Sequence, residues 1–327
     1  MNSQDSSRGL SASGVVELAR VVRNGLTESR HLGAAVVTGP NGSVLKAFGD
    51  TSSALVYPRS SIKPLQAVTV LAAGADLQGV EVALASASHA GTKPHQDAVA
   101  AELSRIGLSE QDLGCPEDWP LDPQAQATAR LGDGKRRLAM NCSGKHASFL
   151  SACVANGWPI DSYLDPEHPL QLRIRQTVED YSGEPVGAIG VDGCGAPLFA
   201  LTLEALARGI GKIASGITEE SSRLTEAIQR HPWAIDGIGR PNTVVVEELG
   251  LLCKGGAEGV MVIADKDGTC LALKVLDGSH RATTAIALKL LEEVGVISKE
   301  QRIRVSALTT EQVLGGGVAV GQVEVVI

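Results

Sequence analysis

The chain has 327 residues, of which 43% are hydrophobic, 20% charged and only 3% aromatic. This is the composition of a folded globular protein, with few aromatic rings on which bases or sugars could stack. The formal net charge of −8 and the pI near 5.4 provide no basic field for a phosphate backbone or an anionic bilayer. We therefore exclude nucleic acid and membrane as partners.

The first residues, Met1–Gly14, are rich in Ser, Asp and Gly and lack the apolar stretch of a signal peptide. They indicate a disordered tail that precedes a single domain over residues 15–327. No segment has about 18 uninterrupted apolar residues. The six scattered cysteines are too sparse for a disulfide scaffold and suit a reducing compartment. Together these features predict a cytoplasmic protein.

Apolar runs separated by glycine turns predict two β-hairpins. The first joins residues 33–39 to residues 43–48 through the turn Pro40-Asn41-Gly42. The second joins residues 259–264 to residues 270–275 through Lys266-Asp267-Gly268. The end of the chain, residues 318–327, is also rich in β-forming residues.

Between the hairpins, apolar residues recur at helical spacing over residues 62–75, 96–106, 144–156, 169–181 and 203–214. A last helix is predicted over residues 281–294. Because strands at both chain ends enclose helices, we expect an α/β fold with one antiparallel sheet built from both ends. The last helix would lie on one face and a central helical subdomain on the other.

The first motif that could support catalysis is Tyr57-Pro-Arg-Ser-Ser-Ile-Lys63, which leads into a predicted helix. Ser60 and Lys63 are three residues apart and share a helix face. A partly buried neutral lysine can accept the serine proton, so Ser60 is a candidate nucleophile. About one Ser-x-x-Lys match is expected by chance in such a chain. A second match, Ser43 with Lys46, lies in a predicted strand, where odd spacing separates the side chains.

Two further motifs follow in the order known from serine β-lactamases and penicillin-binding proteins. Ala87-Ser-His89 supplies a serine in a loop, and Lys254-Gly-Gly256 supplies a lysine before two glycines. Ser88 and Lys254 could therefore form a second hydroxyl-amine pair that relays protons to the leaving ammonia. Taken singly, Ser88 also fits a turn residue and Lys254 a solvated surface charge.

A third cluster combines Met140-Asn-Cys-Ser-Gly-Lys-His146 with Gly190-Val-Asp-Gly-Cys-Gly-Ala-Pro197. Cys142 and Cys194 could supply two thiolates to Zn²⁺, with Lys145 or His146 and water completing a tetrahedral site. Two buried thiols are an equally good interpretation. Cys142 with His146 at helical spacing could also form a thiol nucleophile pair, although no third group to orient that histidine is evident.

These motifs together resemble the asparaginase II family, the Rhizobium-type L-asparaginases. The resemblance rests on five motifs: Arg59-Ser-Ser-Ile-Lys-Pro64, Ala87-Ser-His89, Asn141-Cys-Ser-Gly-Lys-His146, Asp192-Gly-Cys194 and Lys254-Gly-Gly256. Glu28-Ser-Arg-His31 and His168-Pro-Leu-Gln171 extend it, so the resemblance covers the chain from about Val22 to its end.

The resemblance implies a fold like that of serine β-lactamases and penicillin-binding proteins, and hydrolysis of L-asparagine to L-aspartate and ammonia. It implies two Ser-Lys pairs, Ser60 with Lys63 and Ser88 with Lys254. It also implies a Zn²⁺ site made by Cys142, Lys145 and Cys194, which would help to seat the α-amino acid end of the substrate. Four residues would line the substrate pocket: His146, Asp192, His89 and Asn141. No organic cofactor is expected, and a homodimer is left open.

The expected reaction is a two-step acyl transfer. Ser60 attacks the side-chain amide, ammonia leaves, and water releases aspartate, with backbone N–H groups of Ser60 and of Gly256 or Ala257 as oxyanion donors. Asp192 would favour a substrate that carries an ammonium group. Three rivals remain open: a glutaminase or β-lactam hydrolase with the same nucleophile, a thiol hydrolase that uses Cys142, and a non-catalytic amino-acid-binding protein.

Overall fold

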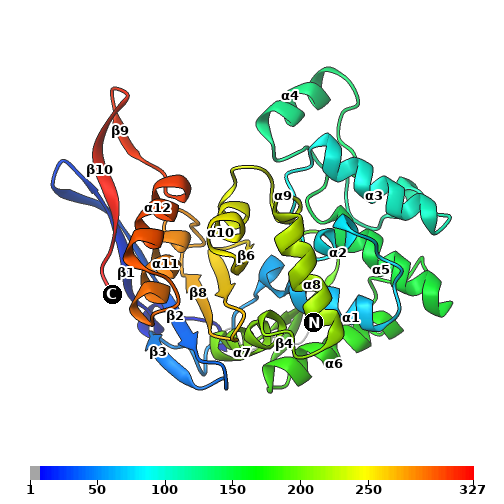
Figure 1. The fold of residues 1–327 in the computed structure, drawn as a ribbon, viewed down its shortest axis with the longest axis horizontal. Helices are drawn as coiled ribbons and strands as arrows, with labels where there is room; N and C mark the ends of the chain where they lie inside the picture. Colours follow the sequence, from blue (N-terminus) through cyan, green and yellow to red (C-terminus); the bar gives the residue numbers. More distant parts are fainter. Residues whose placement is uncertain (1–7) are drawn as a thin grey trace.

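A computed structural model describes residues 8–327, and within them one antiparallel sheet of eight strands dominates the fold (Figure 1). The strands are β1 (Val16–Arg23), β2 (Leu26–Thr38), β3 (Val44–Phe48), β6 (Leu252–Gly256), β7 (Val260–Ala264), β8 (Cys270–Val275), β9 (Val313–Gly315) and β10 (Val318–Val325). Their order is β6-β7-β8-β2-β1-β10-β9, and β3 also pairs with β2. The first and last parts of the chain thus share one sheet, as predicted.

Both predicted hairpins are confirmed, as β2-β3 and β7-β8. Strand β1 was not predicted, although the turn that joins it to β2 has the same Asn-Gly sequence as the first predicted hairpin. Asn24 and Gly25 both have positive φ, 47° and 82°, which is the conformation that Asn-Gly turns favour. In the sheet, Thr38 of β2 is opposite Cys270 of β8, and Gly33 is opposite Val275. Strand β2, from the first part of the chain, thus pairs directly with β8, from the last part.

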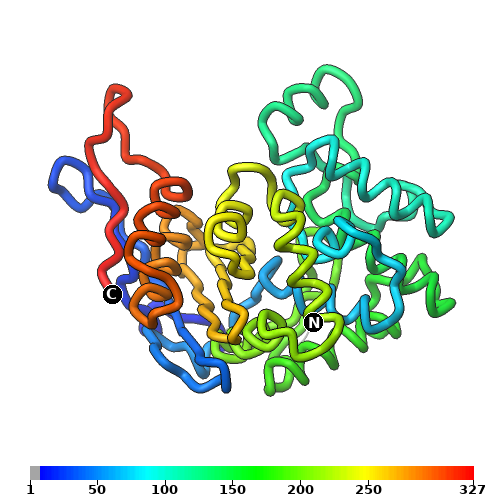
Figure 2. Tube along the Cα trace, in the orientation of Figure 1, coloured from blue at the N-terminus to red at the C-terminus, as the bar shows by residue number. Residues whose placement is uncertain are grey.

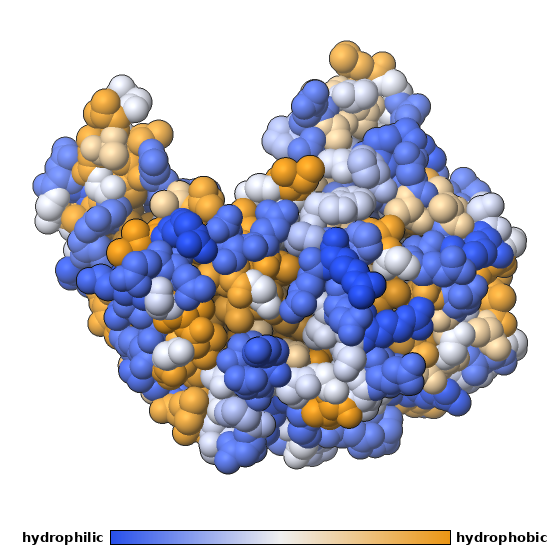
Figure 3. All heavy atoms as spheres, in the orientation of Figure 1, coloured by the Kyte–Doolittle hydropathy of each residue, from blue (hydrophilic) through white to orange (hydrophobic). Residues whose placement is uncertain are grey.

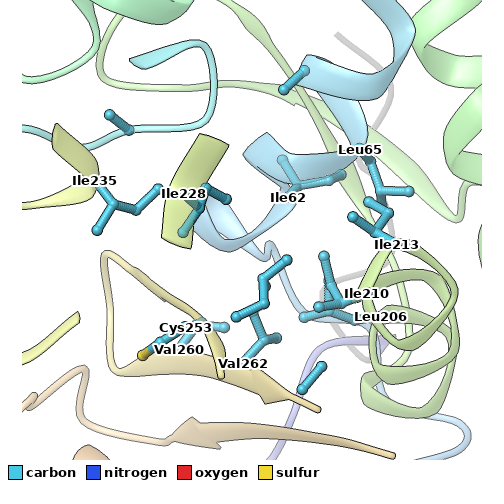
Figure 4. Close-up of a cluster of buried hydrophobic side chains, with 14 of the residues drawn as sticks. Ile62, Leu65, Leu206, Ile210, Ile213, Ile228, Ile235, Cys253, Val260 and Val262 are labelled. Carbon is cyan, nitrogen blue, oxygen red and sulfur yellow. The ribbon is translucent and has the colours of Figure 1, made fainter. Parts of the chain in front are cut away.

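Helices cover both faces of this sheet. On one side α7 (Leu203–Ala214) packs against β2 and β8, and in the close-up of the core its Ile210 and Ile213 lie near Val260 and Val262 of β7 (Figure 4). Side chains alternate along a strand, so the buried Met261 points to the other face, where α11 (Thr283–Glu293) packs. The predicted last helix is therefore present, but α12 (Lys299–Thr309) follows it and packs against it.

The remaining helices form a second lobe, which is the predicted helical middle (Figures 1 and 2). They are α1 (Lys63–Ala72), α2 (Val80–Leu84), α3 (Lys93–Arg105), α4 (Pro123–Leu131), α5 (Ser143–Asn156), α6 (Pro169–Ser182), α8 (Glu219–Arg230), α9 (Pro232–Ile235) and α10 (Pro241–Leu249). A small two-stranded sheet, β4 (Ala188–Val191) with β5 (Pro197–Ala200), completes it.

The centre of the molecule is α1, which contacts α5, α6, α7 and α8. Its residues from Lys63 to Leu71 are all buried, so the helix is enclosed on every side. Leu65 of α1 and Ile62 just before it meet the apolar side chains of α7 and β7 in one core (Figure 4). Burial of each such side chain contributes about 1.5–3 kcal/mol. This core fixes the start of α1 against the sheet.

Residues 8–14 differ from the predicted disordered tail. Leu55 donates a backbone hydrogen bond to Arg8, and Gly14 closes a short 3-10 helix over Ala12–Gly14. These backbone contacts attach the segment to the body of the protein. The rest of the predicted tail, residues 1–7, lies outside the described residues. Across residues 8–327 no helix is long and apolar enough to cross a bilayer.

Candidate active site

Ser60 lies in a 3-10 turn, Arg59–Ile62, that leads directly into α1. Arg59, immediately before it, has a φ of 51°, which is uncommon for a residue other than glycine. On the other side of the turn, a Cβ atom at Gly256 would lie 2.3 Å from the carbonyl oxygen of Pro58 and 3.3 Å from the amide nitrogen of Ser60. Only glycine allows β6 to approach the serine this closely.

Ser88 connects the two buried lysines. Its Oγ lies 3.0 Å from Lys63 Nζ and 2.9 Å from Lys254 Nζ. Lys254 reaches this point because it is opposite Val262 in the sheet, on the face that meets the start of α1. Both lysine side chains are almost fully buried, at 1% and 0% exposure. The predicted contact between Ser88 and Lys254 is therefore present.

The two lysines have different environments. Lys63 Nζ donates to the Ala87 carbonyl, at 2.5 Å, to Ser88 Oγ and to Cys142 Sγ, at 3.0 Å, and these acceptors use all three donors of an ammonium group. Burial, followed by the charge of Lys63, lowers the pKa of Lys254 to about 7. Lys254 is thus the lysine that can be neutral near pH 7 and can accept a proton.

The predicted pairing of Ser60 with Lys63 is not made directly. Across residues 8–327, no hydrogen bond joins Ser60 Oγ to Lys63 Nζ; the lysine is bonded to Ser88 instead. Helical spacing placed the two residues on one face, but the loop that carries Ser88 occupies the lysine's donors. Ser88 therefore contacts both lysines, and the structure shows no direct contact of Lys63 with Ser60 in the described residues.

Ser60 and Ser88 line a common cleft of about 640 Å³. Its other walls include Asn141, the segment Gly255 to Ala257, and residues at the start of α11. The surface is hollowed between the arm that carries β9 and β10 and the lobe that carries α4 (Figure 3). Residues next to both structures, Leu121 and Glu311, contribute to the cleft. The cleft is within the size range of small-molecule sites.

The predicted pocket residues Asn141 and His89 have different positions. Asn141 lines the cleft, and its Oδ1 accepts a hydrogen bond from Cys142. His89 is fully buried: Gly91 N–H donates to its Nδ1, and its Nε2 contacts Ser143 Oγ at 2.9 Å. Both ring nitrogens are therefore occupied by the protein. The structure differs here from the prediction of direct substrate contact, because the histidine holds two loops together.

The three predicted metal ligands gather in one buried cluster behind Lys63. Lys145 Nζ lies 3.0 Å from Cys194 Sγ, while Cys142 Sγ contacts Lys63. His146 joins the cluster, with its Nδ1 2.6 Å from the Tyr163 hydroxyl and its Nε2 buried without a hydrogen-bond partner. Residues far apart in the sequence, at the start of α5 and on the loop after β4, thus lie close together.

The pKa values of the two thiols shift in opposite directions. Their mutual hydrogen bond lowers the pKa of Cys194 and raises that of Cys142, and the Lys145 ammonium further favours a thiolate at Cys194. Burial alone would lower the pKa of Lys145, but the neighbouring sulfur atoms raise it.

Two sulfur donors with an adjacent amine suit Zn²⁺ chemically. Within the described part of the chain, however, no group of three or more His, Cys, Asp or Glu side chains is arranged to hold a metal ion. A zinc site would need Lys145 as a ligand and stays a prediction.

The carboxylate of Asp192 forms an ion pair with Arg59. The Arg59 Nε lies 2.6 Å from Asp192 Oδ1, which also accepts from the Gly193 amide. The ion pair joins the loop after β4 to the residue just before Ser60. Asp192 is therefore placed to hold the Ser60 turn, and its predicted contact with a substrate ammonium stays untested.

A group of polar residues on the sheet side of the cleft was not predicted from the sequence. Asp236 binds Arg240 at 2.5 Å and Asn242 at 2.9 Å, and Asn242 accepts the Gly255 amide at 3.0 Å. This chain of contacts braces the strand that carries Lys254. Arg281 also lines the cleft. The glycine- and proline-containing loop from Asp236 to Pro241 marked a turn, but no motif connected it with Ser60.

Ser60 and Ser88 thus line one cleft of an α/β fold, and two buried lysines contact Ser88. The chain belongs to the L-asparaginase II family, whose model matches residues 19–325. It is therefore an amidohydrolase.

No protein with a curated description matches the chain. Among solved structures, it is similar to a β-lactamase from Mycobacterium bovis, with 16% identity over 80% of this chain and 94% of that one and a TM-score of 0.44. It is also similar to a Bacillus glutaminase, with 11% identity over 82% and 92% of the chains and a TM-score of 0.35.

Proposed function

We propose that this amidohydrolase hydrolyses L-asparagine to L-aspartate and ammonia through an ester on Ser60. The observation that carries the proposal is the contact of Ser88 with both Lys63 and Lys254 in the cleft that Ser60 lines. Family membership supports hydrolysis of an amide. The arrangement supplies a hydroxyl nucleophile, a lysine with a pKa of about 7 and a hydroxyl that can relay protons between them.

In the first step, Ser60 Oγ attacks the carbon of the side-chain amide. Its proton passes through Ser88 Oγ to neutral Lys254, and a tetrahedral oxyanion forms. The C–N bond then breaks, the same relay returns a proton to the nitrogen, and ammonia leaves. Lys63 donates to Ser88 Oγ, to the Ala87 carbonyl and to Cys142 Sγ, and its role is to hold the Ser88 hydroxyl in place.

In the second step, water attacks the ester carbon and gives its proton to Lys254. Ser60 Oγ leaves with the relayed proton, and L-aspartate is released. The oxyanion formed in both steps would be held by the backbone N–H groups of Ser60 and of Gly256 or Ala257. The packing at Gly256 supports this role, because a Cβ added there would lie 3.3 Å from the Ser60 amide nitrogen, so the two backbone segments are close neighbours.

If Zn²⁺ binds, Cys142, Lys145 and Cys194 would hold it, and the ion would supply charge that orients the α-amino acid end of the substrate. The thiol-hydrolase rival is not favoured by the geometry. Cys142 is buried, its Sγ contacts Lys63 and Asn141, and its pKa is raised well above the ordinary value, first by its hydrogen bond to Cys194 and then by burial.

The proposal is tested by trapping the ester. Protein quenched in acid during turnover of L-asparagine should carry the added mass of an aspartyl group on the peptide that contains Ser60. The Cys142→Ser variant, which keeps Ser60, should still form that adduct. An adduct on Cys142, or turnover without any ester, would overturn the proposal. Turnover of L-glutamine or of a β-lactam in place of L-asparagine would reassign the substrate, and asparagine binding without ammonia release would indicate a binding protein.

A further inference from the structure

Arg281 is a cation of the cleft without a carboxylate partner. It lies between β8 and α11 and lines the same cleft as Ser60 and Ser88. Across residues 8–327 its guanidinium makes no ion pair and donates no hydrogen bond, and its Nε is buried without a partner. A guanidinium offers five donors, and a buried donor left without an acceptor is unfavourable. The protein thus keeps a cation without a protein partner in the cleft that Ser60 and Ser88 line.

The other charged groups of the cleft do not neutralise Arg281. Arg240 is paired with Asp236, at 2.5 Å, so that carboxylate is already occupied. Glu311, the other carboxylate that lines the cleft, makes no ion pair with Arg281 in the described residues. The contrast between the paired Arg240 and the unpaired Arg281 indicates that an acceptor for Arg281 comes from outside the chain.

The start of α11 adds to this positive field. Thr283 and Thr284, its first two residues, line the cleft next to Arg281. The first turn of this helix contains no acidic residue, and no side chain caps it. The amide groups and the dipole at a helix start favour an anion. Arg281 and the helix therefore attract the same kind of ligand group at one end of the cleft.

We propose that Arg281 is a specificity-determining residue that binds the carboxylate of the amide substrate. The inference rests on the proposed function. It limits the substrates to amides that carry a free carboxylate, such as amino acids with a side-chain amide. It disfavours neutral amides and asparagine whose α-carboxylate is blocked. A bidentate guanidinium-carboxylate contact also orients the substrate, which a lysine would do less well.

The test compares two substrates and two variants. Ammonia release is measured with L-asparagine and with its neutral α-amide analogue, L-aspartic acid diamide, for the parent and for Arg281→Met. We expect Arg281→Met to lower kcat/KM for L-asparagine about 10- to 100-fold through a higher KM, and to leave kcat/KM for the diamide nearly unchanged. Arg304→Met, whose guanidinium is paired with Glu248 on α10, is the matched control and should change neither.

An equal loss with both substrates, or no loss with L-asparagine, would overturn the role of Arg281. If the parent releases no ammonia from L-asparagine, the proposed function fails by itself. In that case calorimetric titration with L-aspartate tests Arg281 separately. Binding by the parent that weakens at least tenfold in Arg281→Met supports the proposal, whereas equal binding or no binding by the parent overturns it.

Discussion

The pKa of Lys254 gives the proposed mechanism its most specific consequence, a dependence of rate on pH. Lys254 lies fully buried on β6, where burial and the charge of Lys63 lower its pKa from 10.5 to about 7. Each pKa unit corresponds to about 1.36 kcal/mol, so the folded protein disfavours the ammonium form by roughly 5 kcal/mol. The proton acceptor of the first step is therefore half neutral near pH 7.

The magnitude of the expected effect follows from this value. At pH 6 about one molecule in ten has neutral Lys254, and at pH 8 about nine in ten. We expect kcat/KM for L-asparagine to rise about tenfold per pH unit below pH 7 and to level off above pH 8. Lys254→Arg keeps a cation that cannot release its proton, and it should lower kcat about 10²- to 10⁴-fold at every pH in this range.

The assay is ammonia release between pH 5.5 and 9, with circular dichroism at each pH to confirm that the fold is intact. A kcat/KM that stays flat between pH 6 and 8, or that falls as the pH rises, would refute the assignment of Lys254 as the proton acceptor. Retention of activity in Lys254→Arg would refute it as well.

Three other predictions follow from the packing around the site. Gly256→Ala places a Cβ 2.3 Å from the Pro58 oxygen, so it should destabilise the protein by about 1–3 kcal/mol and lower kcat more than tenfold. Asp192→Asn breaks the ion pair with Arg59 and should lower kcat about tenfold with little change in KM, because Asp192 acts through the turn. The pKa of buried Glu102 is raised from 4.5 to about 8, so its contribution to stability is fully present below pH 4.5 and is lost as the pH rises to 8. Titration of Glu102 should therefore lower the unfolding free energy of the parent by about 4 kcal/mol between pH 4.5 and 7.5. The Glu102→Gln variant should lack this loss.

Each of these three predictions has a control variant or an outcome that would contradict it. Gly132→Ala, where a Cβ meets only the Thr128 oxygen at 3.8 Å, should leave the rate unchanged, and an active Gly256→Ala would contradict close packing at β6. A rise in KM alone for Asp192→Asn would return Asp192 to the substrate pocket. Urea titrations of the Glu102→Gln variant and the parent that keep parallel pH profiles would show that Glu102 does not titrate in this range.

The catalytic motifs could be predicted from the sequence because each is local. Ser60 and Lys63 are close together in the sequence at the start of α1, so spacing alone indicated a candidate nucleophile and an amine. Both hairpins could also be predicted, since an Asn-Gly or Asp-Gly turn between apolar runs is a strong hairpin signal. Lys254 and Ser88, 166 residues apart, needed the motif order and the family resemblance to be paired.

The partners of these residues could not be predicted, because they depend on contacts between distant segments. Spacing suggested that Lys63 activates Ser60, yet the loops of Ala87 and Cys142 take up its donors. His89 looked like a pocket residue, but burial directs both its nitrogens to the protein. Arg281 was predicted only as the start of a helix. Its position in the cleft depends on how α11 packs on the sheet.

The most direct test of the account is ammonia release from L-asparagine by the purified protein beside its Ser60→Ala variant. We predict release by the parent and a loss of at least a thousandfold in Ser60→Ala, with the variant still folded. Equal release by both proteins would contradict Ser60 as the nucleophile. No release by the parent, with its fold intact and Zn²⁺ supplied, would contradict L-asparagine as the substrate.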